Sequence, residues 1–109
     1  MYVHDAEIRV RYQETDKMGV VYYGNYYTWF EVGRNEILRS FGYPCRYLEE
    51  KGIFLPVIES QCRYKHGAVY DDEILVRTSI SELSGAKIEF SYQILNKQNG
   101  MILAEGMTK

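Results

Sequence analysis

The chain has 109 residues, 46% hydrophobic and 26% charged, a composition typical of one compact globular domain and not of a disordered or fibrous segment. Its 13 basic and 15 acidic residues give a net charge of -2 and form no long run of one sign, which argues against a nucleic-acid-binding domain. No uncharged apolar run reaches the roughly 18 residues that span a bilayer, and the first residues lack the pattern of a signal peptide. We therefore expect a soluble cytoplasmic protein, with Cys45 and Cys62 as reduced thiols.

The first predicted element is a strand. From Ile8 to Gln13 apolar and polar residues alternate, which is the period of a strand with one face in water. The stretch 14–19 is rich in turn-forming residues, and Val20 to Gly24 follow before the period changes. The sequence therefore predicts a change of element at Asn25.

A helix is predicted over Asn25 to Phe41. Its apolar residues recur at spacings of three or four, at Tyr26, Phe30, Gly33, Ile37 and Phe41. Asn25 is expected to cap the first turn through its side-chain oxygen, and Gly42 followed by Pro44 should end the helix. Gly33 costs about 1 kcal/mol of helix propensity relative to alanine, which is tolerable where a helix lies close against a sheet. A short second helix is predicted over Cys45 to Lys51.

Four strand-like segments make up the rest of the chain: Phe54–Lys65, Glu73–Leu83, Ala86–Asn96 and Met101–Thr108. The pair Asn99-Gly100 is a hairpin turn signal. The order of strand, helix and four strands predicts the α+β class, with a five-stranded antiparallel sheet wrapped around one long helix. We expect a single domain over residues 1–109, whose last strand either is cut short or lies at a sheet edge, because no turn or polar tail follows it.

The stretch from Tyr12 to Tyr26 resembles the opening of the hotdog-fold thioesterases of the 4-hydroxybenzoyl-CoA thioesterase family, especially its short bacterial acyl-CoA members. In that family an Asp is followed closely by a Gly and then by a branched-apolar and aromatic run into the central helix; here these are Asp16, Gly19 and the run 20–26. Later segments that also resemble the family are Arg63-Tyr64, Tyr70–Glu73 and Ala104–Gly106. This chain departs from the family at Tyr23, where many members have His, and at Gly67, where Pro is frequent.

The resemblance implies hydrolysis of an acyl-CoA with a small, medium or aryl acyl group. Judged on spacing alone, Asp16 would be an Asx-turn residue, but the resemblance makes it the catalytic carboxylate, acting as nucleophile or as general base. The backbone amides of Tyr23 and Gly24 would hold the oxyanion at the start of the helix. The residues expected to bind substrate are Tyr12, Val21, Tyr22 and Asn25.

Other polar residues carry weaker expectations. Glu31 and Glu59 are alternative carboxylates, and His4 and His66 lack the spacing of a metal site or a catalytic relay. No metal and no cofactor is expected, because coenzyme A is part of the substrate. Cations that could hold its phosphates, or be merely solvated, are Arg63, Lys65 and Lys87.

The resemblance also implies a homodimer joined through edge strands, with the sites at the interface, and stacking of dimers into a homotetramer. The alternative function is a non-catalytic hotdog module that binds acyl-CoA as a ligand. A hotdog dehydratase fits less well, because its usual loop histidine has no match between Asp16 and Asn25.

Overall fold

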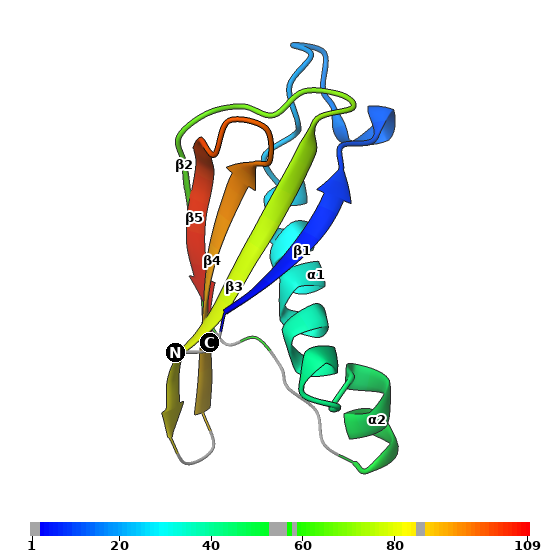
Figure 1. Cartoon of the computed structure of the whole chain (residues 1–109), viewed down its shortest axis with the longest axis vertical. Coiled ribbons are helices and arrows are strands. Elements are labelled where there is room, and N and C mark those ends of the chain that lie inside the picture. Colours follow the sequence, from blue (N-terminus) through cyan, green and yellow to red (C-terminus); the bar gives the residue numbers. More distant parts are fainter. Residues whose placement is uncertain (1–2, 53–56, 58, 85–86) are drawn as a thin grey trace.

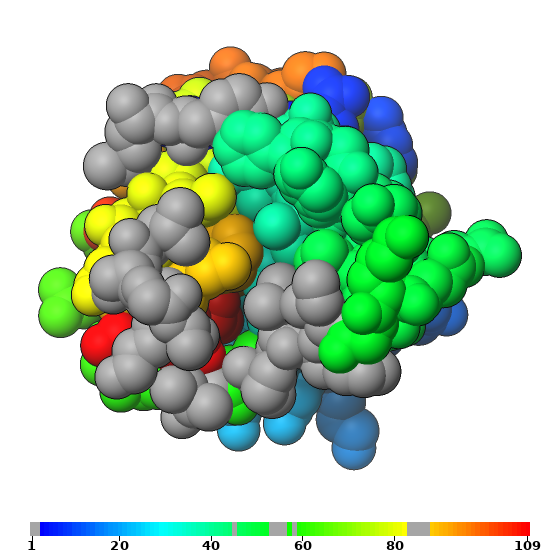
Figure 2. All heavy atoms as spheres, turned by 90° about the horizontal axis from the view of Figure 1, so that it is seen from below, coloured from blue at the N-terminus to red at the C-terminus, as the bar shows by residue number. Residues whose placement is uncertain are grey.

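The computed structural model describes the chain apart from residues 1–2, 53–56, 58 and 85–86. Five strands form one sheet: β1 (Val3–Arg9), β2 (Ser60–Tyr64), β3 (Glu73–Ser84), β4 (Lys87–Asn96) and β5 (Ile102–Thr108). The long helix α1 (Asn25–Ser40) runs along one face of this sheet, and the short helix α2 (Cys45–Glu50) lies beside the C-terminal end of α1 (Figures 1 and 2). The predicted α+β architecture, the hotdog arrangement of a sheet around one main helix, is confirmed.

The strand order is β1-β3-β4-β5-β2, and every neighbouring pair is antiparallel. The two edges of the sheet are therefore β1 and β2, while β5 lies between β4 and β2. Of the two expectations for the last strand, a position at a sheet edge is wrong. The strand β2 pairs with the outer side of β5, with Cys62 opposite Gly106.

The first strand lies earlier in the chain than predicted. Its pairing with β3 ends where Arg9 faces Glu73, and residues Tyr12–Glu14 form a turn of 3-10 helix instead of continuing the strand. The Glu14 carboxylate accepts a hydrogen bond from the Arg11 amide at 2.8 Å and closes this turn. Tyr12, whose side chain is 77% exposed, consequently leaves the face that Ile8 and Val10 were expected to share with it.

The start of α1 also differs from the prediction. Gly24 is the capping residue, and Asn25 is the first residue of the helix. The Asn25 side chain does not cap, because its Nδ2 donates to the Glu14 carbonyl oxygen at 2.9 Å. The helix ends at Ser40, one residue before the predicted Phe41, and Gly42 follows with a φ of +86°.

The remaining elements agree closely with their predictions. Helix α2 ends one residue early, at Glu50, and the Asn96–Met101 turn has Gly100 at a φ of +73°. The predicted strand 54–65 partly falls outside the described residues, and its described part is strand only over Ser60–Tyr64. No helix in the described part of the chain is long and apolar enough to cross a membrane.

The core lies between α1 and the sheet, where Gly33 allows a close approach. A Cβ built on Gly33 would lie 2.6 Å from Val76 Cγ1 on β3. Phe30 of α1 stacks on Tyr92 of β4 with ring centroids 4.5 Å apart. The close packing of helix on sheet, inferred from a glycine in the apolar stripe, is confirmed, and it holds the middle of α1 against β3 and β4.

Candidate active site

Asp16 lies at the tip of a small hairpin between the 3-10 helix and α1. The Asp16 amide donates to Val20 O at 2.9 Å, and Thr15 pairs with Val21. Asp16 Oδ1 accepts a hydrogen bond from the Met18 amide at 2.8 Å, so the residue does form an Asx turn. The carboxylate is exposed, and within the described part of the chain no hydrogen bond uses its second oxygen. The turn therefore orients the Asp16 side chain through Oδ1 and leaves its other carboxylate oxygen available.

At the start of α1, two backbone amides have no acceptor among the residues that the structure describes. The carbonyl oxygens of Tyr22 and Tyr23 accept hydrogen bonds from the amides of Asn25 (2.9 Å) and Tyr26 (3.2 Å), which begins the helix. Among the described residues, the amides of Tyr23 and Gly24 themselves donate to no group. A Cβ on Gly24 would lie 2.8 Å from the Tyr22 ring, so the ring can lie there only because residue 24 is glycine. Together with the helix dipole, such amides can hold a developing negative charge.

The four residues expected to bind substrate have different environments. Val21 is buried on the returning arm of the hairpin, and the Asn25 side-chain amide is bonded to the Glu14 carbonyl oxygen. Tyr22 lies with its ring 4.6 Å from that of Tyr23, and its interaction with Tyr23 raises the pKa of Tyr22. Tyr12 packs edge-on against Tyr70 at 5.8 Å, outside the core of the described chain, and makes no hydrogen bond there with Asp16.

A hollow of about 230 Å³ is lined by Tyr23 and by residues of β2 and the loop after it, and its aromatic wall consists of Tyr23, Tyr26 and Tyr64. Tyr64 lies on β2, and its hydroxyl donates to the Tyr23 carbonyl at 3.2 Å. A tyrosine with its ordinary pKa of about 10 is already a neutral donor at neutral pH, and burial, followed by the Cys62 thiol, raises the pKa of Tyr64 further. Sequence reasoning noticed Tyr64 only through the family resemblance, because its place in the site depends on pairing between β2 and β5.

Glu14 is a site residue to which the sequence pattern assigns no role, because it falls in the predicted turn 14–19. Only 5% of its surface is exposed, although it carries a carboxylate. Its Oε1 accepts from the Arg11 amide at 2.8 Å and its Oε2 from the Trp29 indole Nε1 at 2.9 Å. The three-residue spacing from Arg11 to Glu14 is that of a capping box and was the one available signal.

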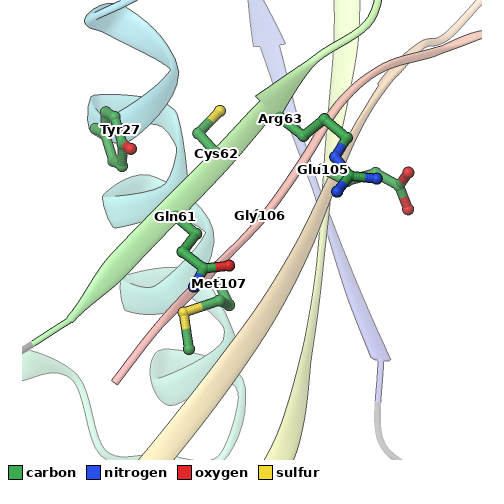
Figure 3. Close-up of a pocket in the computed structure, with 7 residues that line it drawn as sticks. All are labelled: Tyr27, Gln61, Cys62, Arg63, Glu105, Gly106 and Met107. Atoms are coloured by element: carbon green, nitrogen blue, oxygen red, sulfur yellow. The ribbon is translucent and has the colours of Figure 1, made fainter.

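A larger hollow of about 640 Å³ lies along the edge strand β2 (Figure 3). Tyr27 of α1 and Cys62 lie on the helix side of the strand, and Arg63 and Glu105 lie on the other. Cys62 is a free thiol, and burial raises its pKa, which makes it a poor thiolate nucleophile.

The remaining polar candidates are placed as follows. Lys65 pairs with Glu105 at 2.7 Å, Arg63 is exposed beside it, and the Lys87 side chain lies outside the described residues. Glu31, Glu59 and His66 are exposed, whereas His4 is half-buried and its Nδ1 has no hydrogen-bond partner in the described structure. Among the described residues, no three His, Cys, Asp or Glu side chains gather as a metal site.

The family model described as "Thioesterase superfamily" matches residues 18–102. The chain belongs to the thioesterase superfamily. It is 40% identical to the putative acyl-CoA thioesterase YneP of Bacillus subtilis over 96 residues. These residues cover 88% of this chain and 70% of the relative. It is 34% identical to the acyl-CoA thioesterase YbgC of Haemophilus influenzae, over 94% of this chain and 74% of the relative.

A solved structure gives the same answer for the fold. The DHNA-CoA thioesterase from Staphylococcus aureus superimposes with a TM-score of 0.94 at 37% sequence identity, and the match covers 99% of this chain and 72% of that chain. The resemblance stated from the sequence is therefore confirmed at the level of family and fold.

Proposed function

We propose that this thioesterase-superfamily protein hydrolyses acyl-CoA thioesters, with Asp16 as its catalytic carboxylate and the amides of Tyr23 and Gly24 as its oxyanion donors. The observation that carries the proposal is a pair of amides at the start of α1 that donate to no group in the described part of the chain, and they follow the returning arm of the hairpin that presents Asp16. The names of the relatives support the reaction class, since YneP and YbgC are called acyl-CoA thioesterases.

The residues present supply what thioester hydrolysis needs. The carbonyl oxygen of the thioester accepts hydrogen bonds from the two amides, and negative charge develops on it as the carbonyl carbon is attacked. In one route Asp16 removes a proton from water, the hydroxide adds to the carbon, and the C–S bond breaks to release the thiolate. In the other, Asp16 itself attacks, the thiolate leaves, and water cleaves the mixed anhydride. The thiolate, with a free pKa of about 8.5, leaves without an acid, and neither route requires a metal or cofactor.

We assign the acyl group to the hollow lined by Tyr23, Tyr26 and Tyr64. Its volume of about 230 Å³ falls below the roughly 300–1,000 Å³ of pockets for drug-sized ligands, so it has room for an acyl group but not for coenzyme A as well. Its ring surfaces suit small, medium or aryl acyl chains. The coenzyme A would then lie outside this hollow.

We further propose a homodimer formed through β2, and stacking of dimers into a homotetramer. β2 is an edge strand of five residues whose outer side pairs with no other described strand. The exposed rings of Tyr64 on β2 and of Tyr23 and Tyr27 beside it add apolar surface there. The β2 strand of a second copy of the chain would cover the outer backbone groups and these rings. We place the protein in the cytoplasm, because the unpaired Cys62 fits a reducing compartment.

The test is release of free thiol from a panel of short, medium and aryl acyl-CoA esters. Asp16→Asn is a clean variant, because an asparagine oxygen can still accept from the Met18 amide and hold the turn. It should lose roughly 10²-fold or more in kcat. Asp72→Asn is the matched control, since Asp72 likewise accepts from a backbone amide, that of Val69 at 3.0 Å, and lies outside the proposed chemistry.

Two results would count against this function. If wild-type protein releases no thiol from any ester, or if Asp16→Asn keeps the wild-type rate, the catalytic assignment fails. Tight acyl-CoA binding without turnover would instead support the ligand-binding module. Light scattering on the eluting peak of a sizing column tests the assembly, and a monomer would contradict it.

A further inference from the structure

Glu14 is a buried carboxylate that the proposed chemistry does not use. Burying a carboxylate is costly unless donors surround it, and here each oxygen has one. The Arg11 amide donates to Oε1, and the indole of Trp29, itself only 1% exposed, donates to Oε2. The Arg11 guanidinium adds a charge 3.6 Å from Oε1. The side chain therefore joins the end of the first strand to the second turn of α1.

The backbone carbonyl of the same residue makes two more connections. It accepts a hydrogen bond from the Tyr22 amide at 2.9 Å and another from Asn25 Nδ2 at 2.9 Å. Tyr22 and Asn25 flank the two residues whose amides donate to none of the described residues, and Asp16 is two residues after Glu14. One residue thus holds the segment that carries the carboxylate, the hairpin arm that leads to the amides, and the start of the helix.

We propose that Glu14 is a positioning residue that sets the separation between the Asp16 carboxylate and the amides of Tyr23 and Gly24. The inference rests on the proposed function, because it presupposes that these groups act on one thioester. Glu14 touches no reacting atom and acts through the four donors that it fixes. Displacement of a reacting group by about 1 Å commonly costs roughly 10²-fold in rate, so loss of this anchor should lower kcat far more than it raises KM.

The decisive variant is Glu14→Gln, which keeps the length and shape of the side chain. A glutamine has one acceptor oxygen, so its NH2 group must face either the Arg11 amide or the Trp29 indole, where two donors meet. We expect kcat to fall by roughly 10²-fold with KM changed by no more than about threefold. Glu50→Gln is the matched control, because Glu50 lies on α2 with its side chain 66% exposed, and it should retain the wild-type kcat.

A second pair of variants separates positioning from loss of fold. Trp29→Phe removes the indole donor. In the Glu14→Gln/Trp29→Phe double variant the glutamine NH2 group therefore no longer faces a second donor at position 29. The double variant should therefore lose less rate than the product of the two single losses. In an Asp16→Asn background, adding Glu14→Gln should lower kcat by less than about a further tenfold, because that background has no carboxylate at position 16 to position.

The outcomes are distinguishable from failure of the function itself. If wild-type protein is inactive, or Asp16→Asn is fully active, the proposed function fails first. If Asp16→Asn loses rate while folded Glu14→Gln keeps the wild-type kcat, the function stands and the positioning role is overturned. If Glu14→Gln and Trp29→Phe lose rate only in proportion to their unfolded fraction, measured for both variants by circular dichroism, Glu14 is structural and the proposal is likewise overturned.

Discussion

Replacing Gly33 by alanine sets two known effects against each other at the contact between α1 and β3. Alanine gains about 1 kcal/mol of helix propensity over glycine. Its methyl group, however, would lie 2.6 Å from Val76 Cγ1 and still closer to Thr78 Oγ1, and both of these side chains are fully buried. An extra methyl in a packed core costs about 1–3 kcal/mol, and two fixed neighbours favour the upper end. We therefore expect a net loss of about 2 kcal/mol.

Urea unfolding followed by fluorescence measures this loss directly, because Trp29 is the only tryptophan and lies in the core. A loss of about 2 kcal/mol corresponds to a fall in Tm of about 10 °C for a domain of this size. Thr78 Oγ1 has no hydrogen-bond partner in the described structure, so Thr78→Ala removes the nearest obstacle without leaving another group unpaired. The cost of Gly33→Ala should shrink in that background. Equal or greater stability of Gly33→Ala would refute the close approach of helix and sheet.

Three further predictions concern the site and the core. Tyr64→Phe removes the donor to Tyr23 O, whose peptide also carries the Gly24 amide, and should lower kcat by about 2- to 10-fold in a thiol-release assay; an unchanged kcat would show that this bond does not orient the amide. Burial raises the pKa of Tyr92 to about 12, whereas in the unfolded chain it is about 10. The unfolded chain therefore loses this proton at a lower pH than the folded protein does. The free energy of unfolding should fall as pH rises from about 10 to 12, by up to about 3 kcal/mol. Tyr92→Phe loses the bond to Thr108 at pH 7, about 1 kcal/mol, but should show a smaller alkaline loss in pH-dependent urea titrations; an identical alkaline loss would contradict this account. Exhaustive treatment with a chelator should leave the rate within about twofold, and a loss restored by added metal would show that the chemistry needs an ion.

Periodic patterns in the sequence predict most of the helices and strands. The 3.6-residue period of α1, the alternation in β3 and β4, and the glycine signals after each helix and in the last hairpin are local properties, so they were legible without tertiary structure. The place of Asp16 in an Asx turn was also local, since the Met18 amide that it binds is two residues away. Its catalytic role came from family resemblance and stays a prediction until the substitution is made.

Tertiary structure decided the features that depend on residues distant in sequence. The alternation from Ile8 to Gln13 misled because the Glu14 carboxylate closes a 3-10 turn there, and Glu14 is held inside the protein by Trp29, fifteen residues away. Asn25 was read as a cap because its type favours one, but the Glu14 carbonyl lies within reach and takes its amide instead. Tyr64 joins the site only because β2 pairs with β5 at the edge of the sheet opposite β1. Sequence determined which residues can make such bonds, and the packing of α1 on the sheet determined which of them meet, because a buried donor or acceptor takes whatever partner the fold brings near.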